Sequence, residues 1–228
     1  MTHMLIDMMR AAPELPRGVL RAGRRLTRTG VFTLESLARL RMNFANRSQH
    51  DSMSERAVAL SWIAENLLAL HGVSVHVCGE LPAAAPELPA VPAVPVVLDA
   101  GMLGYVAPLA ILAVRPAAVV GPRSVLGWPV WTLFGHELRA LGLVDCEREP
   151  RAAVARFLAM GVSVLVIAEP EAAAHAAREH GAPLLAAGVS CDSPPQSYMP
   201  LMARQDTHVT VSFLPSSGAG AERPRRAA

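Results

Sequence analysis

Lysine is absent from this sequence, and aromatic residues, cysteines and long uncharged apolar runs are scarce. All 21 basic residues are arginine, and Phe, Trp and Tyr make up 4% of the 228 residues. The three cysteines lie far apart and form no C-x-x-C pair, which argues against a zinc knuckle and a disulfide scaffold and favours a reducing cytoplasm. Arg115 interrupts the longest apolar stretch, Val94 to Val120, so no segment predicts a membrane-spanning helix. The first residues also lack the continuous apolar stretch of a secretory signal.

Aliphatic residues are abundant instead. Hydrophobic residues make up 52% of the chain, mainly alanine, leucine and valine, which predicts a closely spaced aliphatic core. The length suits one main α/β domain with a short segment at each end. We expect a basic helical arm and linker over residues 1–52, an α/β domain over 53–215, and a disordered basic tail over 216–228.

Arginine is concentrated at the two ends of the chain. Residues 1–50 hold nine arginines and three acidic residues, and residues 219–228 hold three arginines and one glutamate, so these segments carry charges of +6 and +2. The net charge of +2 then leaves 2 − 6 − 2 = −6 for the middle. A basic arm on an acidic body predicts contact with phosphate groups of lipid or nucleic acid.

Within the arm, four arginines recur at helical spacing: Arg17, Arg21, Arg24 and Arg28. They form one stripe, with Val19, Ala22 and Leu26 opposite. The stripe predicts contact with an anionic membrane surface, to which each arginine contributes about 1 kcal/mol. The alternative is a solvated helix face, because the apolar side is thin.

Helical and extended patterns alternate along the rest of the chain, which predicts a mainly parallel sheet flanked by helices. A polar linker is expected over residues 45–54. The periodicity predicts helices over 16–42, 54–71, 106–114, 128–141, 150–161 and 171–181, and strands over 73–77, 96–99, 117–121, 163–169, 182–190 and 208–215.

The order of these segments resembles the phospholipid and glycerol acyltransferase family, whose best-known members acylate lysophosphatidic acid. The resemblance covers roughly residues 55–215. It rests on the segments HGVSVHVCGELP, VVLD, FGHELRALGLVDCER, GVSVLVIAEPE, GAPLLAAGVS and HVTVSFLP. It implies a glycerolipid acyltransferase-like α/β fold, with the catalytic motif N-H-x-S-x-x-D expected after the VVLD strand.

The catalytic motif of the family is degenerate in this chain. Asp99 and Ala100 replace its asparagine and histidine, and Tyr105 replaces its aspartate. The family resemblance implies that the histidine is the general base and that the aspartate orients it, and an alanine cannot accept a proton. Among the histidines of this chain, only His50 has an acidic residue, Glu55, five positions later. His50 lies in the expected linker and not after a core strand.

Two residues are candidates for a remaining substrate site. Arg148 aligns with the arginine of the family's V-D-R segment, which implies a contact with glycerol phosphate. Glu169 aligns with the glutamate of F-P-E-G-T-R, but Pro170, Glu171 and Ala172 replace its G-T-R. The alternatives are an ordinary loop arginine and a carboxylate favoured at a helix N-terminus.

These features lead to three hypotheses. The first is a noncatalytic acyltransferase-like protein that binds a lipid, an acyl chain or a partner, in the cytoplasm or at the inner face of the membrane. The second is an active acyltransferase that uses a substitute base, with Asp99, His136 or His175 as candidates. The third, binding of nucleic acid through the arm, is not expected because the body is acidic and aromatics are few. No cofactor is expected, and no metal, because His136-Glu137 lacks a second histidine four residues on.

Overall fold

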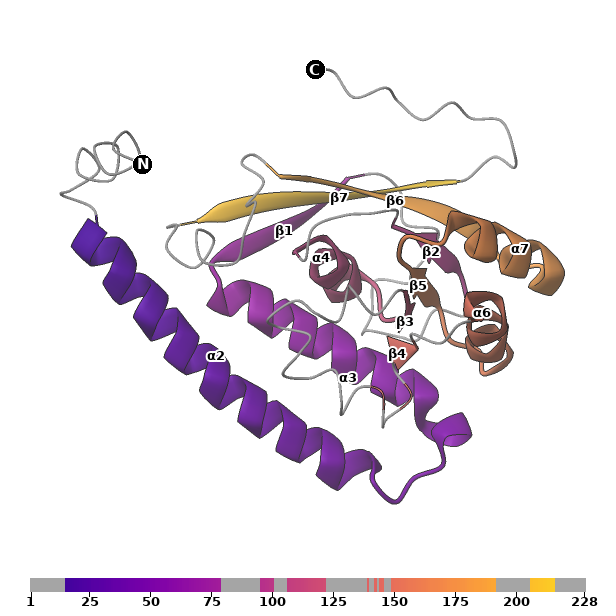
Figure 1. Cartoon of the computed structure of the whole chain (residues 1–228), viewed down its shortest axis with the longest axis horizontal. Helices are drawn as coiled ribbons and strands as arrows, with labels where there is room; N and C mark the ends of the chain where they lie inside the picture. Colours follow the sequence, from indigo (N-terminus) through magenta and orange to yellow (C-terminus); the bar gives the residue numbers. More distant parts are fainter. Residues whose placement is uncertain are drawn as a thin grey trace.

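The computed structural model describes residues 15–78, 95–100, 106–121, 139, 142, 144–145, 149–191 and 206–215 (Figure 1). Its helices are α2 (Leu15–Phe44), α3 (Gln49–Leu70), α4 (Val106–Val114), α6 (Pro150–Ala159) and α7 (Pro170–His180). Its strands are β1 (Val73–Cys78), β2 (Val97–Asp99), β3 (Ala118–Val120), β4 (Val144–Asp145), β5 (Val164–Val166), β6 (Leu184–Cys191) and β7 (Thr207–Pro215). The expected helix over 128–141 and the expected tail lie almost entirely outside these residues.

The strands form one seven-stranded sheet in the order β1-β7-β6-β2-β5-β3-β4. All neighbouring pairs are parallel except β6 and β7, which are antiparallel. The predicted α/β fold with a mainly parallel sheet is therefore confirmed. Strands β3 and β5 are apolar and buried at every position, as expected for central strands covered on both faces. Strand β4, which was not predicted, extends the sheet beyond β3.

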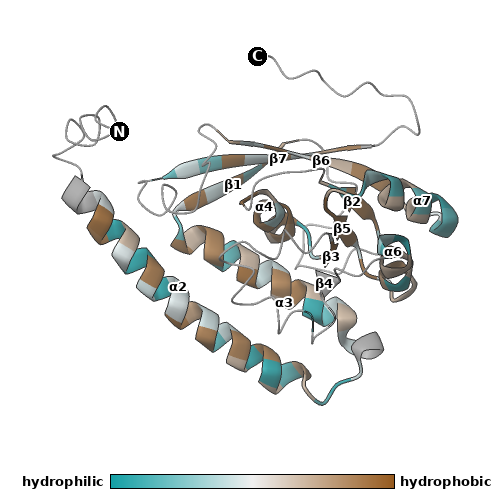
Figure 2. Ribbon diagram, in the orientation of Figure 1, coloured by the Kyte–Doolittle hydropathy of each residue, from teal (hydrophilic) through white to brown (hydrophobic). Residues whose placement is uncertain are grey.

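Helices cover both faces of the sheet (Figure 1). Helices α3 and α4 pack together on one face, where α4 contacts β1, β6 and β7, whereas α6 and α7 pack together on the other and contact β2, β3, β5 and β6. Helix α4 connects β2 to β3, while α6 and α7 lie in connections that run the opposite way along the sheet. Right-handed crossovers place such opposed connections on opposite faces. Figure 2 shows the result as hydrophobic residues in α4 and the inner strands and hydrophilic residues on the outside of α6 and α7.

Helices α2 and α3 form a long antiparallel hairpin beside this domain. The turn between them is short, because α3 begins at Gln49 and not at Ser54. The expected linker over 45–54 is thus wrong for its second half, and the expected boundary at residue 52 falls inside a helix. The reason is burial, since Ser52 and Met53 are both packed in the first turns of α3. The guanidinium group of Arg56 also stabilises this turn, because it donates hydrogen bonds to the carbonyl oxygens of Phe44 and Arg47.

The buried side of α2 faces α3 and consists of Ala22, Thr29, Thr33, Ser36, Leu40 and Phe44. Of the apolar residues expected opposite the arginine stripe, only Ala22 is buried, whereas Val19 and Leu26 are exposed. The expected apolar side opposite the arginines is thus only partly the side of the helix that packs. Within the described residues, no helix is both long enough and apolar enough to cross a membrane.

Candidate functional site

The parallel strands bring three chain segments to one edge of the sheet. Asp99, the last residue of β2, is in register with Val166, the last residue of β5, and Val166 is in register with Val120 at the end of β3. The turns that follow these strands therefore begin at the same level. Their backbones are joined by hydrogen bonds from Ala100 N–H to Val166 O (3.0 Å) and from Ile167 N–H to Val120 O (2.9 Å).

The point between β2 and β5 is where the chain reverses its direction along the sheet. The connection after β2 runs over one face through α4, and the connection after β5 runs over the other face through α7. In open α/β sheets such a switch point leaves a crevice outside the carboxyl ends of the two strands, where ligands bind. Topology alone thus selects the turns that begin at Ala100 and Ile167 as the candidate site.

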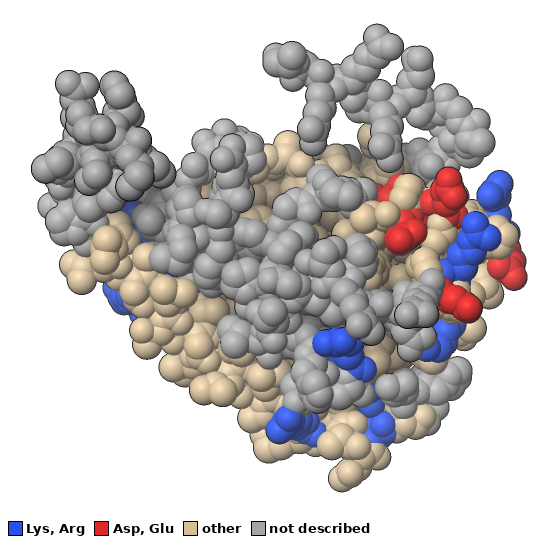
Figure 3. Space-filling view, in the orientation of Figure 1, with Lys and Arg blue, Asp and Glu red and all other residues tan. Residues whose placement is uncertain are grey.

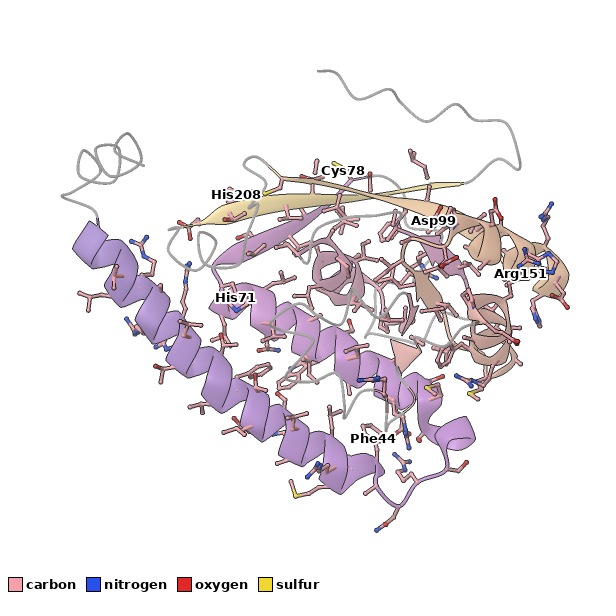
Figure 4. The ribbon with its side chains drawn as sticks, viewed as in Figure 1. Phe44, His71, Cys78, Asp99, Arg151 and His208 are labelled. Atoms are coloured by element: carbon pink, nitrogen blue, oxygen red, sulfur yellow. The ribbon has the colours of Figure 1, made fainter. Side chains whose placement is uncertain are left out.

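Strand β2 contributes a carboxylate and a methyl group to this edge. Asp99 is half-buried, and Figure 4 shows it at the end of β2 within the body of the domain. Ala100 is 3% exposed, and its N–H donates a hydrogen bond to the carbonyl oxygen of Val166. A methyl group neither accepts nor donates a proton, so position 100 supplies no acid–base chemistry. Tyr105 lies outside the described residues.

Strand β5 ends in a tight turn that leads into α7. Ala168 has φ +61°, an uncommon left-handed conformation for a residue with a Cβ. Glu169 then takes the N-cap position, half-buried, and Pro170 occupies the first turn, where its missing N–H costs nothing. The Glu169 side chain makes no capping hydrogen bond, but its carbonyl accepts from Ala173 N–H at 3.1 Å. The helix dipole favours a carboxylate at this helix end. This agrees with the alternative in which Glu169 stabilises the helix N-terminus and does not contact a substrate.

An open groove of about 410 Å³ lies between the N-termini of α6 and α7. Figure 3 shows acidic and basic side chains together at this end of the molecule. Among the described lining residues of the groove, three carboxylates outnumber one guanidinium group, and their side-chain charge disfavours a phosphate group. Its lining residues are Glu149, Pro150, Arg151, Ala152, Glu169, Glu171 and Ala172.

None of the described histidines belongs to the turns that follow β2 and β5. His71 is buried where α3 ends, and His76 and His208 lie on neighbouring strands with ring centroids 5.9 Å apart (Figure 4). His175 Nε2 lies 3.5 Å from an oxygen of Glu179 on the exposed side of α7. The candidate His136 lies outside the described residues. Among the described residues, no group of three or more histidine, cysteine or acidic side chains suits a metal ion.

The arginines of the predicted stripe belong to a second and separate concave surface. Arg21, Arg24 and Arg28 line a groove of about 460 Å³ between α2 and the C-terminal end of α3. Sequence reasoning missed Arg25, which lines the same groove, although its position four residues after Arg21 places it on the same side. The side chain of Arg17 lies outside the described residues, as does Arg148. Of the predicted substrate-site residues, the structure therefore describes only Glu169, which shares the sheet edge with Asp99 and Ala100.

Comparison with known proteins gives the fold. No family model matches this chain, and no curated protein matches it. Among solved structures, it resembles the crystal structure of the 1-acyl-sn-glycerophosphate (LPA) acyltransferase PlsC from Thermotoga maritima, with a TM-score of 0.59 and 13% sequence identity, over 92% of this chain and 90% of that chain. The chain thus has an acyltransferase-like fold, as the sequence resemblance implied.

Proposed function

We propose that this chain is an acyltransferase-like protein of glycerolipid or phospholipid metabolism that binds lipid at a membrane surface and does not transfer an acyl group. The fold supports the link to lipid, because the similar solved structure is an LPA acyltransferase. The observation that carries the loss of catalysis is the buried methyl group of Ala100 at the switch point of the sheet.

The chemical reason is proton transfer. An alcohol attacks a thioester efficiently only when a nearby base accepts its proton, and such a base contributes roughly 10²- to 10⁴-fold to the rate. Asp99 is the one described carboxylate at the end of β2. A carboxylate is a weaker base than an imidazole, so it accepts the proton of an alcohol less readily. The geometry therefore favours a binding protein over an enzyme.

The outer face of α2 supports a membrane contact. Leu20, Val31 and Leu34 are 73%, 62% and 72% exposed, and they lie on the side of the helix that faces away from α3. Arg24, which also lines the groove between α2 and α3, is exposed at the border of this face, and Arg41 is exposed further along the helix. A helix with apolar and arginine side chains on one exposed face suits the interface of an anionic bilayer, where both apolar burial and charge contribute.

An acyl-transfer assay tests the catalytic part of the proposal. The purified chain is incubated with acyl-CoA or acyl carrier protein as donor and a lysophospholipid as acceptor, and the diacyl product is measured. We expect no product above the protein-free control. Turnover that disappears in Asp99→Asn would overturn the proposal in favour of an active acyltransferase with a substitute base.

Vesicle flotation tests the membrane part. We expect binding to anionic vesicles that weakens with salt and weakens several-fold in Leu34→Ser, because a large exposed apolar side chain is lost from the contact face. Leu214→Ser is the matched control, since Leu214 is 65% exposed on β7. Equal effects of the two substitutions would argue against α2 as the contact surface.

A further inference from the structure

Four arginines line the groove between α2 and the end of α3. Arg21, Arg24, Arg25 and Arg28 come from two consecutive turns of α2. The opposite wall is α3, which contributes Asn66, Ala69 and Leu70. Asn66 is held in place because its amide donates to the Trp62 carbonyl at 2.8 Å. The groove is thus concave, lined on one side by cations and closed on the other by a short, mostly apolar wall.

The electrostatics of the groove favour an anion. Burial, and then the charge of Arg21, lower the pKa of Arg25, whereas Asp206 raises it. The positive charges of Arg21 and Arg25 are therefore close together in a partly buried place, and the charge of Asp206 partly offsets them. An anion between the arginines would relieve this repulsion and form charge-assisted hydrogen bonds with several of them.

We propose that this arginine groove binds a phosphomonoester dianion. The guanidinium fork matches pairs of phosphate oxygens, and a phosphomonoester presents three such oxygens and close to two negative charges at neutral pH. A phosphodiester presents two free oxygens and one charge, so it satisfies fewer of the four forks. The groove at α6 and α7 is the reverse case, because its described lining residues include three glutamates and one arginine.

The position of the groove fits a lipid headgroup as the source of the phosphate. Leu20, which is 73% exposed, is adjacent to Arg21 in α2, so the apolar contact face and the groove share one end of the helix. In this respect the inference rests on the proposed membrane contact. A free phosphomonoester offers the same chemistry, and the two sources are separated by experiment.

The test compares two kinds of vesicle at equal total negative charge, one containing phosphatidate and the other phosphatidylglycerol. We expect the unmodified chain to bind phosphatidate vesicles about tenfold more tightly, and the double variant Arg24→Gln/Arg28→Gln to lose this preference. Both arginines are exposed, so the variant should keep its fold, which a thermal melt verifies. The preference should also fall below about pH 6, where the phosphomonoester dianion takes up one proton and becomes a monoanion.

The matched control is Arg39→Gln/Arg41→Gln, which removes two exposed charges from α2 outside the groove. Arg39 forms an exposed salt bridge with Glu35 at 2.6 Å, and the loss of such a surface pair costs the fold little. The control should weaken binding to both lipids equally and leave the preference intact. A control variant that also lost the preference would show that total charge, and not the groove, selects the lipid.

A parallel calorimetric titration with glycerol 3-phosphate, without vesicles, reports on a free ligand. Binding there that depends on Arg24 and Arg28, with no binding to vesicles, would support the groove and refute the membrane contact. Equal binding to both lipids together with no binding of glycerol 3-phosphate would overturn the groove while leaving the membrane contact in place.

Discussion

Buried His71 makes the stability of this protein depend on pH in a direction that can be worked out. His71 is 1% exposed at the end of α3, and its Nε2 lies 3.3 Å from Thr29 Oγ1 on α2 (Figure 4). Burial, and then the positive charge of Arg25, lower the pKa of His71 from 6.5 to about 4. The folded state thus keeps the ring neutral at pH values where the unfolded chain binds a proton.

The free energy of unfolding therefore falls as the pH falls. The stabilising contribution of the neutral ring is fully present above pH 6.5 and is lost as the pH falls towards 4, because only the unfolded chain gains the proton in that interval. The difference of 6.5 − 4 = 2.5 pKa units corresponds to about 3 kcal/mol, of which about 2 kcal/mol is lost by pH 4.5.

Urea unfolding of the unmodified chain and of His71→Gln, at several pH values between 7.5 and 4.5, measures the effect. Other groups titrate in this range, but they affect both proteins, so the difference between the two free energies isolates His71. We expect His71→Gln to be less stable than the unmodified chain at pH 7.5, because packing is lost. By pH 4.5 the difference between the two free energies of unfolding should change by about 2 kcal/mol in favour of the variant. Parallel profiles, or an imidazole pKa above 6.5 measured by NMR, would refute the reasoning.

Two further predictions concern the backbone and the hairpin. Gly121→Ala should destabilise the fold by about 1–3 kcal/mol in urea unfolding, because the new Cβ would lie 3.1 Å from Ile167 Cβ and 3.3 Å from its carbonyl oxygen. Gly30→Ala in the middle of α2 is its control. It should stabilise the fold by about 0.5–1 kcal/mol, because a Cβ at this position would have no atom within 4 Å. A loss of stability in this control would contradict the packing described. Arg56→Met should cost about 2–3 kcal/mol by the same measurement, because two backbone carbonyls at the α2–α3 turn lose a buried donor; an unchanged midpoint would show that water replaces it.

The sequence predicted the sheet well because its strands are short apolar runs with clear boundaries. The register places Asp99, Ala100 and Glu169 at one edge of the sheet. The first turn of α3 was missed because its polar residues are characteristic of loops, and their burial depends on contacts with the end of α2. Strand β4 was missed because its two residues carry no periodic pattern.

The side of α2 that packs could not be predicted for a different reason. Helical periodicity shows which residues share a face, but the choice of the buried face depends on the complementary surface of α3. Ala22, Thr29 and Phe44 face α3, whereas Val19 and Leu26 stay exposed. The same choice of face places Arg25 in the groove between α2 and α3.

The distribution of charge connects the two proposals. The described groove at the strand ends has three carboxylates and Arg151 among its lining residues, whereas four arginines line the groove between α2 and α3. The side-chain charge of the second groove favours a phosphate group and that of the first disfavours it, since the sign of the local potential is opposite. The proposed lipid-binding surface is thus separate from the turns that follow β2 and β5.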